Sequence, residues 1–174
     1  MERTLIVLKP DAVKRGIIGE ILTRFERVGL KVVGCKMLQP DYDHYYHHYE
    51  NIGKMVSRRG KEAFDVTLEM MNEGPVIAFV LEGIESVKLV RKMVGTTEPK
   101  AAQPGTIRGD YAHISFDYAN GEGIGIPNII HASGDPAEAE EEIRHWFSES
   151  ELFEYETVYE TYTQAKSRPK SKQK

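Results

Sequence analysis

Two apolar stretches decide the fold, Thr4-Leu5-Ile6-Val7-Leu8-Lys9 and Pro75-Val76-Ile77-Ala78-Phe79-Val80-Leu81. Each is a near-continuous apolar run between polar residues, which is the pattern of a strand buried on both faces. Leu30–Leu38 and Asn128–Ile130 have the composition of two further strands. The two apolar runs are therefore predicted to be the central strands of a four-stranded sheet.

Apolar residues that recur every three or four positions predict amphipathic helices between these strands. The first covers Ile18–Val28, the second covers Val87–Val94, and the third follows the N-cap and proline pair of Asp135–Phe147. The order of elements is βαββαβ with a final helix. Asp41–Asn72 is predicted to form a helical hairpin on the outside of the sheet. The Gly- and Pro-rich stretch Gly95–Pro127 is predicted to be a long functional loop.

The chain has 174 residues and a net charge of −4, from 23 Lys and Arg against 27 Asp and Glu. This balance argues against a dedicated duplex-DNA binder that neutralises phosphates. The charge is uneven, because residues 164–174 contain five Lys or Arg and no acid. Apolar side chains there are too few to offset the entropy of ordering. We therefore expect one folded domain over 1–163 and a basic, disordered tail over 164–174.

No apolar stretch approaches the ~20 residues that a bilayer requires, and the N-terminus has no signal-peptide core. We expect a cytoplasmic protein without a membrane partner. Cys35 is the one cysteine, which excludes an internal disulfide and a cysteine zinc cluster. His44, His47 and His48 have a helical spacing that could bind a metal, but no acid or cysteine completes the set. We expect these three residues to be solvated or cavity-lining, and we predict no protein metal site.

His131 is the histidine with the clearest chemical setting. It follows a short apolar strand and precedes the helix expected at Asp135, whose N-terminus leaves room for an anion. With an unperturbed pKa of ~6.5, imidazole is largely neutral at pH 7 and can act as a nucleophile without a separate base. Glu142 could hold its second ring nitrogen and so fix the tautomer. The same spacing also fits a half-buried structural histidine.

Four segments resemble the signatures of the nucleoside diphosphate kinase family and occur in the same order as in the family. They are Leu8-Lys9-Pro10-Asp11, Arg15-Gly16-Ile17-Ile18-Gly19-Glu20-Ile21, Pro104-Gly105-Thr106-Ile107-Arg108-Gly109-Asp110 and Asn128-Ile129-Ile130-His131-Ala132-Ser133. The resemblance covers about residues 3–155. The resemblance implies an α+β, ferredoxin-like antiparallel sheet with helices on the outside, a helical hairpin and a long nucleotide-site loop. It also implies ping-pong transfer of a γ-phosphate from a nucleoside triphosphate to a nucleoside diphosphate through a phosphohistidine. It further implies that Mg²⁺ is bound mainly through the nucleotide phosphates and that the chain assembles into a homo-oligomer.

The resemblance assigns roles to individual positions. His131 matches the nucleophile, and Ser133 and Glu142 match the pair that orients it. Lys9 matches a catalytic lysine that also contacts the phosphate and the ribose hydroxyl, and Tyr49 matches the catalytic tyrosine beside it. The remaining matches are the phosphate-binding Arg91, Thr97 and Arg108, and the sugar-binding Asn128. Arginine forks and a lysine point charge suit phosphoryl transfer, which requires positioning and neutralisation of the phosphate oxygens. Taken singly, Lys9 and Arg91 also fit solvated surface charges, and Tyr49 fits a packing residue.

Two segments depart from the family pattern by being longer than is usual in it. There are 24 residues between Tyr49 and Gly74, and 19 between Arg108 and Asn128. The first change puts Ala63 where the base-stacking phenylalanine of the family belongs, so the neighbouring Phe64 is predicted to replace it. Gly134 also stands where the family has an aspartate.

The alternative interpretation is a catalytically weak nucleotide- or RNA-binding module on the same fold. The basic tail could tether RNA and would then give salt-sensitive binding of single strands. The aromatic strand motif typical of RNA-binding domains with this layout is missing, so a nucleic-acid partner is disfavoured. Phosphoenzyme formation and turnover with several nucleoside diphosphates distinguish the two interpretations.

Overall fold

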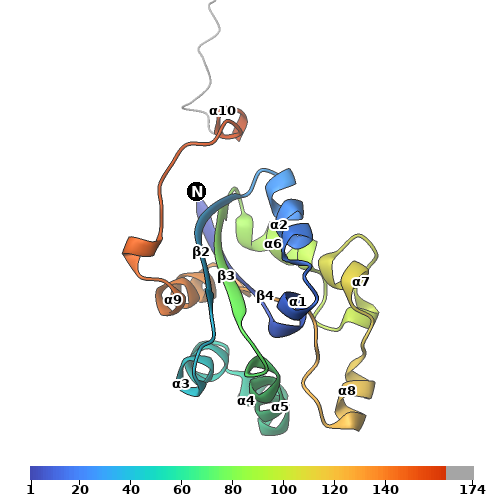
Figure 1. Ribbon diagram of the computed structural model, residues 1–174. Helices are drawn as coiled ribbons and strands as arrows, with labels where there is room; N and C mark the ends of the chain where they lie inside the picture. Colours follow the sequence, from blue (N-terminus) through green and yellow to red (C-terminus); the bar gives the residue numbers. More distant parts are fainter. Residues whose placement is uncertain (164–174) are drawn as a thin grey trace, which may run out of the picture.

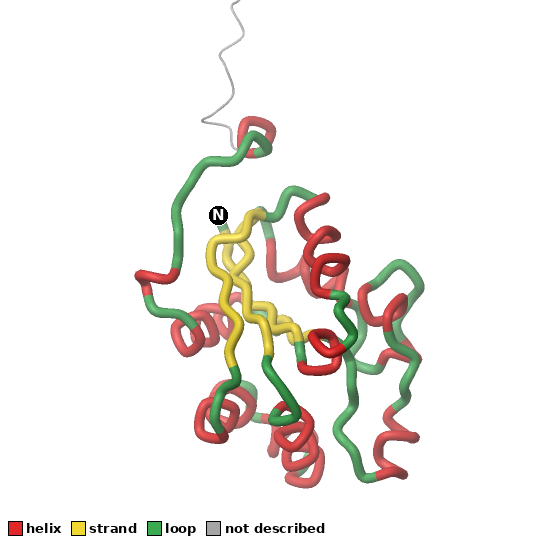
Figure 2. The backbone as a smooth tube through the Cα atoms, in the orientation of Figure 1, coloured by secondary structure: helices red, strands yellow, loops and turns green. Residues whose placement is uncertain are grey.

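The computed structural model describes residues 1–163 and contains one four-stranded sheet with helices packed around it (Figures 1 and 2). The strands are β1 (Glu2–Leu8), β2 (Lys31–Leu38), β3 (Val76–Gly83) and β4 (Ile130–Ala132). The longer helices are α2 (Ile18–Arg27), α5 (Lys61–Met71), α6 (Ser86–Val94) and α9 (Pro136–Trp146). The shorter ones are α1 (Pro10–Lys14), α3 (Tyr42–Tyr46), the π-helix η1 (His47–Ile52), α4 (Met55–Arg59), η2 (Pro99–Ala101), α7 (Ile107–Tyr111), α8 (Phe116–Glu122), η3 (Glu149–Glu151) and α10 (Glu160–Thr163).

The strand order is β2-β3-β1-β4, and every neighbouring pair is antiparallel. The two apolar runs are the central strands β1 and β3, as predicted. They pair from Glu2 opposite Gly83 to Leu8 opposite Ile77. On the other side of β1, Val7 lies opposite His131. The ferredoxin-like α+β fold is confirmed, and it places His131 beside a central strand.

Both faces of the sheet are covered, which explains why β1 is apolar throughout. Leu5 and Val7 point into a core with α5 and α9, whereas Ile6 and Leu8 point into a second core with α2 and α6. Alternate residues of a strand face opposite sides, so a strand between two cores has no polar face.

Helix α6 ends at Gly95, whose φ of 85° is accessible to glycine at little cost. Helix α9 begins as predicted, with the Asp135 side chain accepting a hydrogen bond from the backbone N–H of Glu138. None of the helices within residues 1–163 is long and apolar enough to cross a membrane.

Three local predictions need correction. The hairpin predicted over 41–72 contains four helical pieces, α3, η1, α4 and α5, and the loop predicted over 95–127 contains η2, α7 and α8. The last strand begins two residues later than predicted, at Ile130, because Ile129 has a φ of 75° and interrupts the extended backbone. His131 therefore lies within β4 rather than after it. The predicted basic tail, 164–174, lies outside the described residues.

Candidate active site

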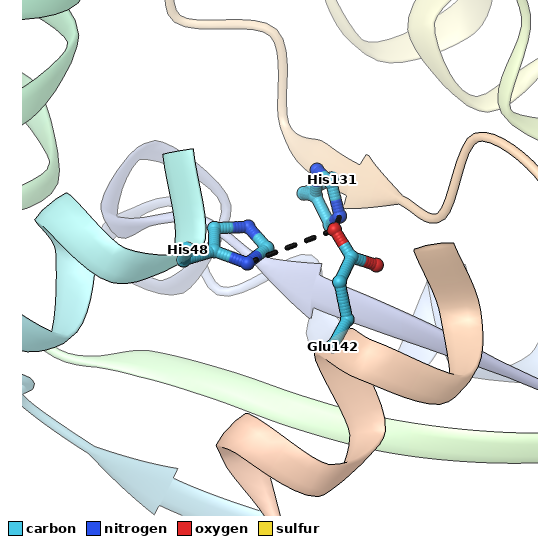
Figure 3. A group of neighbouring side chains, drawn as sticks. All are labelled: His48, His131 and Glu142. Carbon is cyan, nitrogen blue, oxygen red and sulfur yellow. Dashed lines mark ion pairs between the residues drawn. The ribbon is translucent and has the colours of Figure 1, made fainter. Parts of the chain in front are cut away.

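The centre of the site is a contact between the His131 side chain on β4 and a carboxylate on α9. His131 Nε2 lies 2.7 Å from Glu142 Oε1, in an ion-pair contact without the alignment of a linear hydrogen bond. Figure 3 shows that the other ring nitrogen, Nδ1, points away from this carboxylate. His131 is 17% exposed and Glu142 is 1% exposed. The carboxylate thus occupies the buried side of the ring and leaves Nδ1 available for chemistry.

Ser133 fixes the position of the Glu142 carboxylate. The Ser133 hydroxyl donates to Glu142 Oε2 at 2.6 Å and accepts from the backbone N–H of Leu5 at 3.1 Å. Ser133 is fully buried. The serine therefore ties the carboxylate to the central strand β1, and the predicted group of His131, Ser133 and Glu142 is assembled in the structure.

A fourth member of this group, His48 on η1, was missed by sequence reasoning as a site residue. Its ring meets that of His131 edge-to-face, with centroids 4.5 Å apart. The indole N–H of Trp146 donates to His48 Nδ1 at 3.1 Å. Burial lowers the pKa of His48 well below its usual value, so the ring is neutral at pH 7. The available signal was the position of His48 directly before Tyr49 on a predicted cavity-lining helix.

Among the described residues, the nitrogens of His48 and His131 and an oxygen of Glu142 form a group within 4.8 Å that could hold a metal ion (Figure 3). His48 Nδ1 already accepts the Trp146 hydrogen bond. Mg²⁺ prefers six oxygen ligands, and this group offers a single carboxylate. The arrangement is therefore better described as an orienting network for His131 than as a magnesium site.

His131 opens onto a cavity of about 650 Å³ whose lining is rich in cations. Lys9 and Arg108 lie in its wall with 6% and 8% exposure, and Arg91 lies nearer the solvent. Burial lowers the pKa of Lys9 to about 8, against the opposing effect of Asp11. Burial also lowers the pKa of Arg108 to about 10, and the charge of Arg91 adds to this effect. Such a group of cations suits a polyanion.

The backbone carbonyls around Arg108 hold its guanidinium in place. It donates to the carbonyl oxygens of Gly95 at 3.0 Å, Asn128 at 3.1 Å and Ile130 at 2.5 Å. Three of the five N–H groups of an arginine are used in this way, and the other two can bind a ligand. Arg108 therefore joins the end of α6 to β4 as well as placing charge in the cavity.

Asn128, Thr97 and Tyr49 also line the cavity, as predicted. The Asn128 amide donates to the carbonyl of Thr97 at 2.9 Å, while its Oδ1 is buried without a hydrogen-bond partner. The Tyr49 hydroxyl is likewise buried without a partner, and burial raises its pKa. Buried polar atoms of this kind are usually satisfied by some group, so these two atoms are candidates for contact with a ligand.

The prediction that Phe64 replaces a base-stacking ring is wrong for this structure. Phe64 is 3% exposed and belongs to the core beneath α5. Its ring meets the Tyr46 ring edge-to-face at 5.6 Å. It is absent from the cavity lining. Phe64 therefore packs in the core shared with β1 and β3 and does not face the cavity.

The lengthened segments instead contribute residues that sequence reasoning missed. Met55, Arg58 and Arg59 on α4 line the cavity, and so does Ile126, which follows α8. No motif marks these residues, because α4 and α8 are short helices whose placement depends on tertiary contacts. The one sequence feature that could have indicated them is the pair Arg58 and Arg59, two adjacent cations within the lengthened segment.

Comparison with known proteins shows the family of the chain. A family model described as "Nucleoside diphosphate kinase" matches residues 2–152. The chain belongs to the nucleoside diphosphate kinase family. It is 45% identical to the nucleoside diphosphate kinase of Borreliella burgdorferi over 155 residues, covering 89% of this chain and 92% of that protein. It is 46% identical to that of Pyrococcus furiosus, covering 89% and 88% respectively.

Solved nucleoside diphosphate kinases have the same fold. A structure from Borrelia burgdorferi, described as a transition-state mimic with bound vanadate and ADP, superposes with a TM-score of 0.90 at 44% identity. It covers 93% of this chain and 96% of that one. The enzyme from Pyrobaculum aerophilum gives a TM-score of 0.80 at 38% identity, with 88% and 99% covered. The chain is therefore an enzyme of this family that acts on nucleotides, and the alternative of a catalytically weak nucleotide- or RNA-binding module is not favoured.

Proposed function

We propose that His131 Nδ1 attacks the terminal phosphorus of a nucleoside triphosphate. The N–P bond forms as the bond from phosphorus to the leaving nucleoside diphosphate oxygen breaks, which leaves a phosphohistidine. A second nucleoside diphosphate then takes the phosphoryl group in the reverse of this step. The observation that carries the proposal is the orientation of His131, with Nε2 held against Glu142 and Nδ1 directed away from it beside a cationic cavity.

Glu142 and Ser133 orient and stabilise the reacting ring. A phosphorylated imidazole gains positive charge, and the buried Glu142 carboxylate at 2.7 Å offsets that charge. Ser133 keeps the carboxylate in place through its 2.6 Å hydrogen bond. Because His48 stays neutral, it fills the space beside His131 without adding a repulsive charge.

The cations of the cavity bind the phosphates. Arg91 and Arg108 can each offer N–H groups to phosphate oxygens, and Lys9 adds a point charge close to the reacting group. Thr97 contributes from the loop after α6. Asn128 Oδ1 accepts a hydrogen bond from a sugar hydroxyl, and the Tyr49 hydroxyl contacts the ligand beside Lys9; both atoms are unpartnered in the buried wall.

A divalent cation, which we propose to be Mg²⁺, fits this site through the nucleotide rather than through a protein cage. Asp135 and Glu138 at the start of α9 are carboxylates on the cavity wall besides Glu142, and they do not form a compact oxygen cluster. When bound, the ion would neutralise phosphate charge. Lys9, Arg91 and Arg108 would hold the remaining oxygens.

We also propose that the chain forms a homo-oligomer. We place it in the cytoplasm, where its nucleoside di- and triphosphate substrates are found. Strand β2 lies at an outer edge of the sheet, with Cys35 and Met37 exposed on it. Edge strands of this kind offer unpaired backbone groups to another chain. Sedimentation equilibrium would determine the assembly, and a monomer at micromolar concentration would contradict this proposal.

Labelling with γ-³²P-ATP and Mg²⁺ tests the function. The wild-type protein should gain an acid-labile, alkali-stable label and pass it to an added nucleoside diphosphate. His131→Ala should take up no label. His47→Ala is the matched control, because His47 lies outside the cavity lining, and it should be labelled like the wild type. Uptake and transfer of label by His131→Ala would overturn the proposal.

A further inference from the structure

The two lengthened segments meet at the mouth of the cavity. The Arg59 guanidinium carbon on α4 lies 5.3 Å from the centre of the Phe116 ring at the start of α8. Below this contact, Gly125 packs so closely on α5 that a Cβ there would lie 2.5 Å from the Val66 carbonyl oxygen. The segments are therefore packed together at two points, although the contacting residues are 57 and 59 positions apart in sequence.

Phe116 is itself anchored next to Thr97, which is predicted to bind phosphate. Its backbone N–H donates to Glu98 Oε1 at 2.8 Å, and Glu98 directly follows Thr97. The side chain of Ser115 caps α8 by accepting from the Tyr118 N–H at 3.2 Å. The ring on which Arg59 rests is thus held in a defined position relative to the phosphate-binding residues.

Arg59 is exposed and forms no ion pair with an acid among the residues that the structure describes. Its charge acts on the cavity, because it helps to lower the pKa of both Lys9 and Arg108. Arg58 differs, since its guanidinium donates to the Gly53 carbonyl at 2.9 Å within its own segment. The repulsion between Arg59 and the two buried cations is relieved when an anion lies between them.

We infer that Arg59 is an additional phosphate-binding residue, held by Phe116, and that it contacts the phosphates nearer the nucleoside. This inference rests on the proposed function. The terminal phosphoryl group must reach His131, whose side chain is only 17% exposed. The exposed Arg59 in the same cavity lining therefore meets the other end of the phosphate chain. Phe116 acts through Arg59 and is a positioning residue.

Two phosphate donors of different length test the inference. On this inference, bound ATP reaches from His131 to Arg59, whereas phosphoramidate is small enough to react with His131 without reaching Arg59. Arg59→Ala should lower the rate of phosphohistidine formation from subsaturating ATP about tenfold, as expected for loss of one charge-assisted contact at an exposed site. The rate from phosphoramidate should be unchanged. Arg59→Lys should recover part of the ATP rate.

Lys61→Ala is the matched control, because Lys61 carries the same charge nearby but pairs with Asp65 and lies outside the cavity lining. It should behave as the wild type with both donors. If Arg59→Ala is unchanged with ATP, or is impaired equally with both donors, the inference is wrong. A wild-type protein labelled by neither donor would overturn the proposed function itself, and the inference with it.

The role of Phe116 is tested by combining substitutions. Phe116→Leu keeps an apolar side chain but removes the ring face, and it should lower the ATP rate about threefold through misplacement of Arg59. In the Arg59→Ala background, Phe116→Leu should have no further effect. A multiplicative loss in the double variant would show that Phe116 acts independently of Arg59.

Discussion

The surroundings of His131 and the mouth of the cavity differ in how their polar groups are satisfied. Around His131, the serine and the second histidine are buried and both contact the buried carboxylate of Glu142. At the mouth, Arg58 and Arg59 are exposed on a five-residue helix. The proposed reacting group is thus positioned before a ligand arrives. The proposed binding of the outer phosphates instead depends on short helices that tertiary contacts hold in place.

The largest effect is expected from Glu142→Gln. The amide keeps the shape of the side chain but cannot offset the charge of a phosphorylated ring, so kcat should fall about 10³-fold. Stopped-flow measurement of phosphohistidine formation would check this. Glu141→Gln, on the exposed side of the same helix, is the control. A fall below tenfold would mean that the carboxylate has only a packing role.

Phe64→Leu tests whether Phe64 belongs to the hydrophobic core or to the nucleotide site. Because Phe64 lies in the core and away from the cavity, the substitution should lower the free energy of unfolding by about 1.5 kcal/mol. The KM for nucleoside diphosphates should stay within twofold of wild type. Urea unfolding and steady-state kinetics measure the two quantities. A raised KM with unchanged stability would restore the stacking role predicted from the sequence.

Ser133→Ala should lower kcat about tenfold, since it removes one buried hydrogen bond to the carboxylate without removing charge. Its effect should be absent in the Glu142→Gln background, because both residues act through the same ring. Additive losses measured by single-turnover labelling would instead indicate that Ser133 contacts the substrate.

The smallest effect concerns Lys9 and pH. A pKa of about 8 means that Lys9 loses its charge as the pH rises through 8, so KM for ATP should rise on the alkaline side. The arginine of Lys9→Arg keeps its charge at that pH, so the rise of KM above pH 8 should disappear. At pH 7 its kcat should be several-fold lower than that of the wild type. Unchanged alkaline behaviour in Lys9→Arg would assign the rise to another group.

The sequence predicted the central strands and singled out His131 as the proposed nucleophile, because both leave local signals. The runs in β1 and β3 are apolar throughout, and His131 lies in a motif before a capped helix. The two lengthened segments left no such signal. The ends of their short helices depend on tertiary contacts. So does the burial of Phe64, which follows from how α5 packs on the sheet. His48 was missed because its role depends on Trp146, 98 residues away.

The positive φ of Ile129 has a consequence for which residues can share the cavity. In an unbroken strand, residues 128 and 131 are separated by an odd number and would point to opposite faces of the sheet. The left-handed turn at Ile129, held by hydrogen bonds to Lys9 and Asp11, reverses that parity. Asn128 and His131 therefore both line the cavity. A single backbone torsion thus lets the proposed sugar-binding and phosphoryl-accepting groups face one nucleotide.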